Sequence, residues 1–129
     1  MNRLNPNELL QFTRKYRFSG GRIRRLALQY RKGEATLTAA LTVRTSEGAP
    51  VKLKLQLNGV EEHRFQKRPN MPVGKLFEFR LAYLQGRIFV SFDSLGLAPG
   101  EVPGIHDFRA SEAFAAGDVL MWDEVQKKV

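Results

Sequence analysis

The sequence predicts an α+β fold that is predominantly antiparallel β, built as a curved sheet or partly open β-barrel of about seven strands with an N-terminal helix. Two observations predict it. Apolar and polar residues alternate through most of residues 22–92, which is the period of a strand with one buried face. The connections between these runs are short turns rather than segments of helical length, so consecutive strands are expected to pair antiparallel.

The helix is expected over residues 5–18. Asn5 can cap it, Pro6 suits the first helical position, and Glu8 can reach back to the backbone of the cap. Apolar residues then recur three and four positions apart and give the helix one stripe to bury: Leu9, Phe12 and Tyr16. The small residues 19–21 are expected to end the helix.

The strands are expected to begin at residue 22. A bulge is expected near Arg24 and Arg25, because Ile23 is out of phase with the alternation that follows it. The side chains expected to face the core from this first strand are Leu26, Leu28 and Tyr30.

A hairpin turn at residues 32–34 leads to a second strand over 36–44, and residues 51–57 show the most regular alternation in the chain. Asn58-Gly59 follows. This dipeptide favours a type I′ turn, after which residues 60–67 would return antiparallel, while a glycine bulge inside one longer strand is the alternative.

A second hairpin is expected from residues 77–83 and 88–92, joined by a turn at Gln85-Gly86. It carries five aromatic rings, which predict the centre of the core: Phe77, Phe79, Tyr83, Phe89 and Phe92.

Residues 93–110 are rich in glycine and proline and are expected to form one long loop. Residues 111–125 are expected to hold a short helix, capped by Ser111 and ended by Gly117, and then a final strand. The whole chain, residues 1–129, is expected to be a single domain, since its length suits one core.

Composition limits the chemistry. The chain contains no cysteine, so disulfides, thiolate zinc sites and a cysteine nucleophile are excluded, and a cytoplasmic location is expected. The N-terminal residues lack the apolar run of a signal peptide, and no stretch is apolar enough to predict a membrane span.

Charge is unevenly distributed along the chain. Residues 1–33 hold nine basic groups and one acid, within a formal net charge of +8 for the whole chain, whereas residues 93–129 are acidic on balance. We expect a basic patch that attracts another protein with an acidic surface, unless the fold brings the acidic C-terminal third against it. The candidate residues are Arg14, Arg17, Arg22, Arg24, Arg25 and Arg31.

Nucleic acid is the alternative partner of this patch, through its phosphate backbone. The basic segment lacks the aromatic platform typical of single-strand and RNA binders, because Phe12, Tyr16 and Tyr30 are expected in the core.

No catalytic residue, metal ligand set or cofactor motif is predicted. His63 and His106 are the only imidazoles, and Glu61 and Glu62 point to opposite faces of a strand. A small-ligand or enzyme site under the loop of residues 93–110 stays open as a further alternative. In one version of it Ser94 would be a nucleophile beside His106 and Asp107. The candidate polar groups of this site are His106, Asp107 and Arg109.

Residues 20–125 resemble, in layout, small uncharacterised bacterial β-rich domains. The features that carry the likeness are the alternating strand ending at Val60, the aromatic hairpin, and the late strand Leu120–Val125. Some relatives of this kind are immunity proteins that bind toxins, so the resemblance implies a protein partner and transfers no functional residue.

These observations together favour a non-catalytic protein-binding module. The single tryptophan, Trp122, is expected to anchor the core from the last strand, with an exposed interface role as its alternative.

Overall fold

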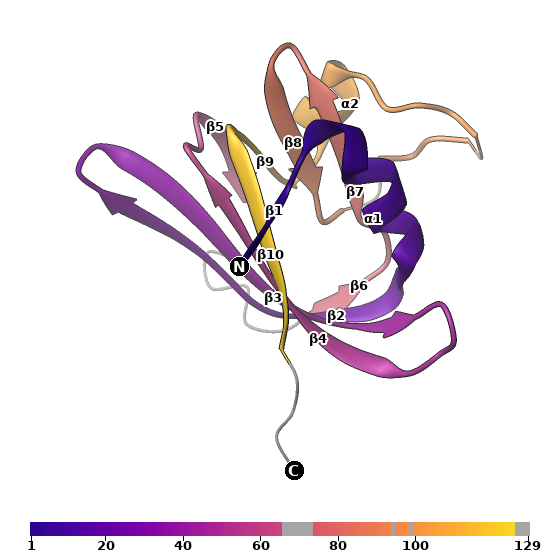
Figure 1. Cartoon of the computed structure of the whole chain (residues 1–129). Helices are drawn as coiled ribbons and strands as arrows, with labels where there is room; N and C mark the ends of the chain where they lie inside the picture. The colour runs from indigo at the N-terminus through magenta and orange to yellow at the C-terminus, as the bar shows by residue number, and fades with distance from the viewer. Residues whose placement is uncertain (66–73, 94, 99, 126–129) are drawn as a thin grey trace.

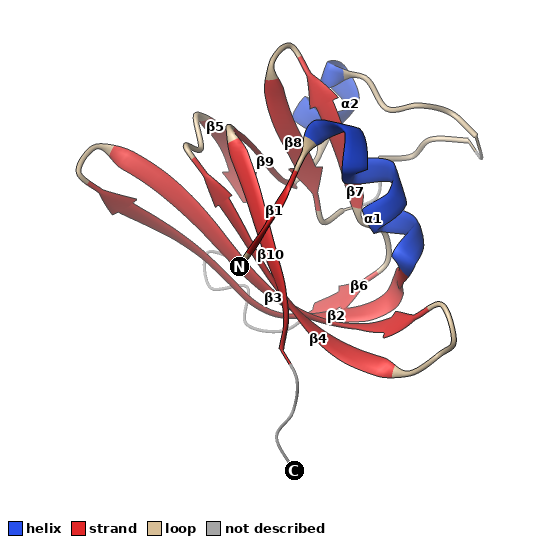
Figure 2. Ribbon diagram, viewed as in Figure 1, coloured by secondary structure: helices blue, strands red, loops and turns tan. Residues whose placement is uncertain are grey.

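The computed structural model describes residues 1–65, 74–93, 95–98 and 100–125, and in them ten strands form two antiparallel sheets (Figures 1 and 2). The six-stranded sheet has the order β1 (Asn2–Leu4), β10 (Val119–Val125), β4 (Pro50–Asn58), β3 (Glu34–Thr45), β2 (Tyr16–Arg31) and β6 (Gly74–Leu76). The four-stranded sheet has the order β5 (Glu62–Phe65), β9 (Ala113–Gly117), β8 (Arg87–Ser91) and β7 (Arg80–Leu84).

The predicted antiparallel β fold with a short N-terminal helix is therefore confirmed. The strands are divided between two sheets, which do not close into a barrel, and they outnumber the seven expected. The extra strands are short or lie in segments without alternation, where the sequence pattern carries no signal.

The main core lies between the two sheets. β3 buries Leu37, Ala39, Leu41 and Val43 on one face, as the alternation predicts. A second, smaller cluster lies on the other face of the four-stranded sheet, under the helix α2 (Ile105–Ala110). Its buried members are Phe89, Phe108, Phe114 and Ala116. The four-stranded sheet is thus covered on both faces.

The N-terminal helical segment starts where predicted, with a 3₁₀ turn (Pro6–Glu8) that leads into α1 (Leu9–Lys15). The Asn5 N–H donates to Glu8 Oε1 over 3.0 Å, so the expected reach of Glu8 back to the cap is present. The helix ends three residues earlier than predicted, since Tyr16 already has extended backbone and begins β2. Tyr16 and Phe18 are both buried two positions apart, which is a strand spacing.

Residues 19–21 do not end a helix as expected, because they lie within β2. The register between β2 and β3 shifts between Arg17 and Arg22, and Gly20 there has a φ of +86°. A Cβ on Gly21 would stand 2.6 Å from the Thr42 carbonyl oxygen, so the close approach of β3 requires glycine. The bulge predicted near Arg24 is confirmed by a second register shift between Ile23 and Arg25.

Asn58-Gly59 makes neither the hairpin nor the bulge that the sequence left open. The chain leaves the six-stranded sheet there and enters β5 of the other sheet. The Val60 N–H donates to the Ala35 carbonyl, and the Glu61 N–H to the Ala116 carbonyl, so the crossing is bonded to both sheets. The expected return strand covered residues 60–67, and residues 66 and 67 lie outside the described residues.

Two predictions for the C-terminal third are wrong. Residues 93–110 include α2, which begins where the Asp107 carboxylate accepts the Gly104 N–H over 2.7 Å and which buries Phe108. The helix expected after Ser111 is instead β9, a strand with every residue buried. β9 lies between β5 and β8 and is covered on both faces, so it lacks the alternation by which a strand is recognised.

The aromatic residues divide differently from the prediction. Phe79, Phe89 and Phe92 are buried, but Phe77 is 70% exposed and Tyr83 is 49% exposed. Tyr30 is not in the core but 68% exposed, because β2 extends beyond the sandwich.

Trp122 is partly buried and packs against the core, with its ring centroid 5.2 Å from that of Phe12, as the core prediction required. In the described part of the chain, the helices are too short and polar to cross a bilayer.

Candidate functional site

The outer face of the six-stranded sheet carries the candidate site. Alternation places the side chains between the core residues of β2, β3 and β4 on this face, and no described helix lies over it (Figure 1). The strand register then fixes which side chains share a row. Arg22 pairs with Thr42 and Thr42 with Lys52, while Arg25 pairs with Ala40 and Ala40 with Lys54.

We call this surface the basic sheet face. Its basic residues are Arg3, Arg17, Arg22, Arg24, Arg25, Arg31, Arg44, Lys52, Lys54 and Lys75. Five of the six residues predicted for the basic patch are among them, but Arg14 is not, since it lies on α1 outside the sheet. The sequence analysis did not include the lysines of β4 in the patch. The alternation of β4 was clear from the sequence, but the strands beside which it lies were not.

The arginines near the β3–β4 turn have local partners. The Arg17 guanidinium donates to the Ser46 carbonyl over 3.0 Å, and Arg44 donates to the Gly48 carbonyl over 2.9 Å. Arg24 makes only a long contact of 3.4 Å to the Thr42 hydroxyl. These contacts orient the guanidinium groups without neutralising them.

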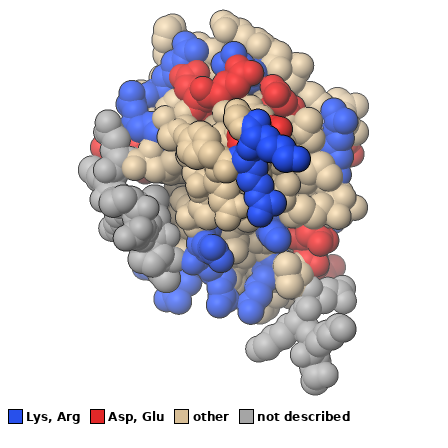
Figure 3. Space-filling model, turned by 90° about the vertical axis from the view of Figure 1, so that its left-hand side faces the viewer, with Lys and Arg blue, Asp and Glu red and all other residues tan. Residues whose placement is uncertain are grey.

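Acidic groups balance only part of the charge on this face. Asp123 lies opposite Lys54 and Glu34 lies opposite Arg31, yet neither pair is joined by a salt bridge in the described structure. The salt bridges present lie elsewhere, between Glu78 and Arg80, Glu61 and Arg87, and Glu62 and Arg109. In Figure 3 basic side chains lie along the lower part of the view with an acidic group beside them at the lower right, and more acidic side chains gather at the top beside other basic ones.

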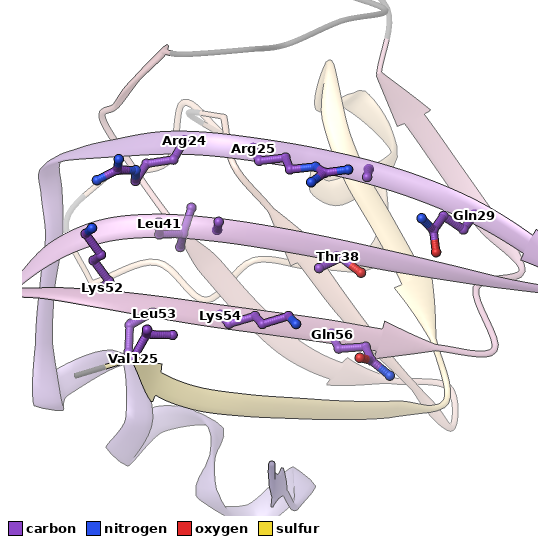
Figure 4. A pocket seen from close by; sticks show the side chains of 12 residues that line it. Arg24, Arg25, Gln29, Thr38, Leu41, Lys52, Leu53, Lys54, Gln56 and Val125 are labelled. Carbon is purple, nitrogen blue, oxygen red and sulfur yellow. The ribbon is translucent and has the colours of Figure 1, made fainter. Parts of the chain in front are cut away.

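A hollow of about 560 Å³ opens on the basic sheet face (Figure 4). Arg24 and Arg25 from β2 and Lys52 and Lys54 from β4 lie on either side of β3. The rest of the lining is uncharged: Ala27, Gln29, Thr38, Ala40, Leu41, Leu53, Gln56 and Val125. The hollow therefore combines four positive charges with hydrogen-bonding and apolar groups, and its lining contains no acid.

A smaller hollow of about 220 Å³ continues along the same strands. It shares Gln29, Thr38 and Gln56 with the larger one and adds Arg31 and Thr36. The two hollows together run from a cluster of four cations, through uncharged polar groups, to Arg31.

The residues of the predicted alternative pocket are placed around α2. Asp107 caps this helix, and the Arg109 guanidinium donates to the Glu62 carboxylate over 2.7 Å, which raises the pKa of Arg109. His106 is exposed on the same helix. Ser94 lies outside the described residues.

No metal or catalytic cluster is formed by the described residues. They contain no group of three metal-ligating side chains, and His63 contacts the Tyr30 hydroxyl through Nε2 at 3.3 Å. Ser91 and Ser111 form a buried hydroxyl pair at 2.9 Å, and both also bond to backbone groups, of Asp93 and Ala113 respectively. Burial and the hydrogen bond to Glu124, 2.7 Å long, raise the pKa of Tyr16, so this phenol stays protonated.

Comparisons with family models, curated proteins and solved structures found no match to this chain. The class of the site is therefore argued from its geometry. A concave, cationic, partly apolar sheet face can bind an anionic surface.

Proposed function

We propose that this protein is a non-catalytic binding module whose basic sheet face binds an acidic surface of another protein. One observation carries the proposal: Arg24, Arg25, Lys52 and Lys54 surround a hollow without an acidic group in its lining. Neighbouring like charges repel one another in the free protein, so the arrangement is explained by a partner that supplies the missing negative charge.

The lining favours a protein over a nucleic acid. Ala27, Ala40 and Val125 supply apolar surface inside the hollow. Protein interfaces combine such surface with arginine and with hydrogen-bonding groups, whereas phosphate contacts need mainly charge. The outward positions of β2, β3 and β4 also include no aromatic residue on which a base could stack.

The proposal is tested by titrating the isotopically labelled protein with poly-L-glutamate and following its backbone amide signals. We expect the largest shifts in β2, β3 and β4. Lys52→Gln/Lys54→Gln removes two charges from the hollow and is expected to weaken binding about tenfold, since exposed charge contacts contribute up to about 1 kcal/mol each. Arg14→Gln/Arg64→Gln is the matched control, because both residues are exposed and lie outside the basic sheet face.

A DNA duplex, titrated at the same ionic strength, decides between the two classes of partner. Tighter binding of the duplex than of polyglutamate, with a steep salt dependence, would favour nucleic acid instead. Equal weakening by both double variants would show that net charge alone drives binding, and the assignment to this face would then be wrong.

A further inference from the structure

The shape of the basic sheet face follows from side-chain length on three neighbouring strands. β3 presents short outward side chains, Thr36, Thr38, Ala40 and Thr42. The flanking strands present mostly long ones, with Arg25 and Gln29 on either side of Ala27 on β2, and with Lys52, Lys54 and Gln56 on β4. A trough therefore runs along β3, with walls from β2 and β4, and the two hollows are its parts.

The dimensions of this trough suit one extended chain. Two strand spacings separate the walls, which is about 9.6 Å, and the floor from Thr36 to Thr42 is about 20 Å long, or about six extended residues. A DNA duplex, whose major groove alone is about 12 Å wide, is too broad to enter.

Charge is graded along the trough. Lys52 and Lys54 stand two residues apart on one wall, and Arg24 and Arg25 stand on the other. Farther along, both walls carry amides, with Gln56 opposite Thr38 and Gln29 opposite Thr36, and Arg31 follows on the wall of β2. Consecutive side chains of an extended peptide point to opposite sides, so a run of acidic residues would reach both charged walls.

We infer that the trough binds an extended acidic segment of the partner, with consecutive carboxylates between Arg24, Arg25, Lys52 and Lys54 and uncharged polar residues between Gln29 and Gln56. This inference rests on the proposed function and specifies its ligand. The peptide lies along β3, its carboxylates accept hydrogen bonds from both walls, and its polar end exchanges hydrogen bonds with the amide side chains.

The test uses two fluorescein-labelled peptides of identical composition, measured by fluorescence anisotropy. One has four consecutive glutamates followed by threonines, and in the other the glutamates alternate with threonine, so that they reach one wall only. We expect the first peptide to bind about tenfold more tightly, since two more charge contacts form. Ala40→Tyr fills the floor without changing the charge and is expected to weaken this peptide at least about tenfold, because the ring occupies the space of the peptide backbone.

Val119→Tyr is the control for added aromatic surface, since Val119 lies outside the trough on the same face. Thermal melts check that both tyrosine variants fold. If Ala40→Tyr does not fold, the difference in affinity between the two peptides for the unmodified protein still tests the inference. Equal affinity for the two peptides, or undiminished binding by folded Ala40→Tyr, would overturn the extended acidic ligand. If polyglutamate binding still depends on Lys52 and Lys54 in that case, the proposed function stands without the extended ligand. If polyglutamate does not bind through these lysines, both the proposed function and the extended ligand are wrong.

Discussion

Replacing Lys52 and Lys54 with glutamine is expected to leave the stability of the free protein nearly unchanged while it weakens binding. The nearest like-charge pairs are Lys52 with Lys54, two residues apart, and each lysine with the arginine two strands away, Arg22 and Arg25. Strand geometry sets these separations at about 6.7 and 9.6 Å. At the dielectric constant of water the three repulsions total about 1.5 kcal/mol, and about 1.1 kcal/mol remains at 0.01 M salt. Asp123 lies one strand spacing, about 4.8 Å, from Lys54 and about 8 Å from Lys52, and its attraction of about 1.1 kcal/mol at the same salt offsets them.

Repulsion and attraction disappear together in the double variant, so its melting temperature is expected to change by less than about 2 °C at 0.01 M salt. At 1 M salt the Debye length is about 3 Å, and no change is expected. Thermal unfolding followed by circular dichroism at the two salt concentrations measures this difference, with Arg14→Gln/Arg64→Gln as the charge-matched control. A fall of about 5 °C or more at 0.01 M salt would refute the conclusion that repulsion from the neighbouring cations offsets the attraction of Asp123.

Three further predictions concern the fold. Gly117→Ala is expected to lower the free energy of unfolding by about 1–3 kcal/mol in a urea titration, because its Cβ would lie 2.8 Å from the Asn58 carbonyl oxygen. Phe108→Ala, at a fully buried position under α2, is expected to cost about 3–5 kcal/mol in the same assay. The raised pKa of Tyr16 means that the unfolded state loses its phenolic proton first, above about pH 10.0. The stability difference between the wild type and Tyr16→Phe should therefore shrink from pH 9 to 11 in unfolding titrations; a constant difference would contradict the hydrogen bond to Glu124.

The sequence predicted strands best where one face of a strand is buried and the other is exposed. β3 and β4 meet that condition, and their alternation is visible in the residues themselves. β9 does not, because Ala113 and Ala115 face the main core while Phe114 and Ala116 face the cluster under α2. A strand buried on both faces shows no alternation of polar and apolar residues. The alanines of β9 therefore suggested a helix.

The candidate site was predictable in part for a similar reason. The arginines of β2 were visible as a cluster in sequence, but their neighbours on β4 come from a strand more than 20 residues later. Only the order β2, β3, β4 brings Lys52 and Lys54 into the same rows as Arg22 and Arg25. Strand order depends on long-range pairing, which no local pattern contains.

The pairing of Asn2 with Trp122 affects how the nascent chain can fold. β10 lies between β1 and β4, so the six-stranded sheet lacks two adjacent strands until the last of these residues has left the ribosome. Until then β4 presents an unpaired edge with alternating leucines, a segment prone to pair with other chains. Lys52 and Lys54 alternate with those leucines, and their charge would oppose such association during synthesis.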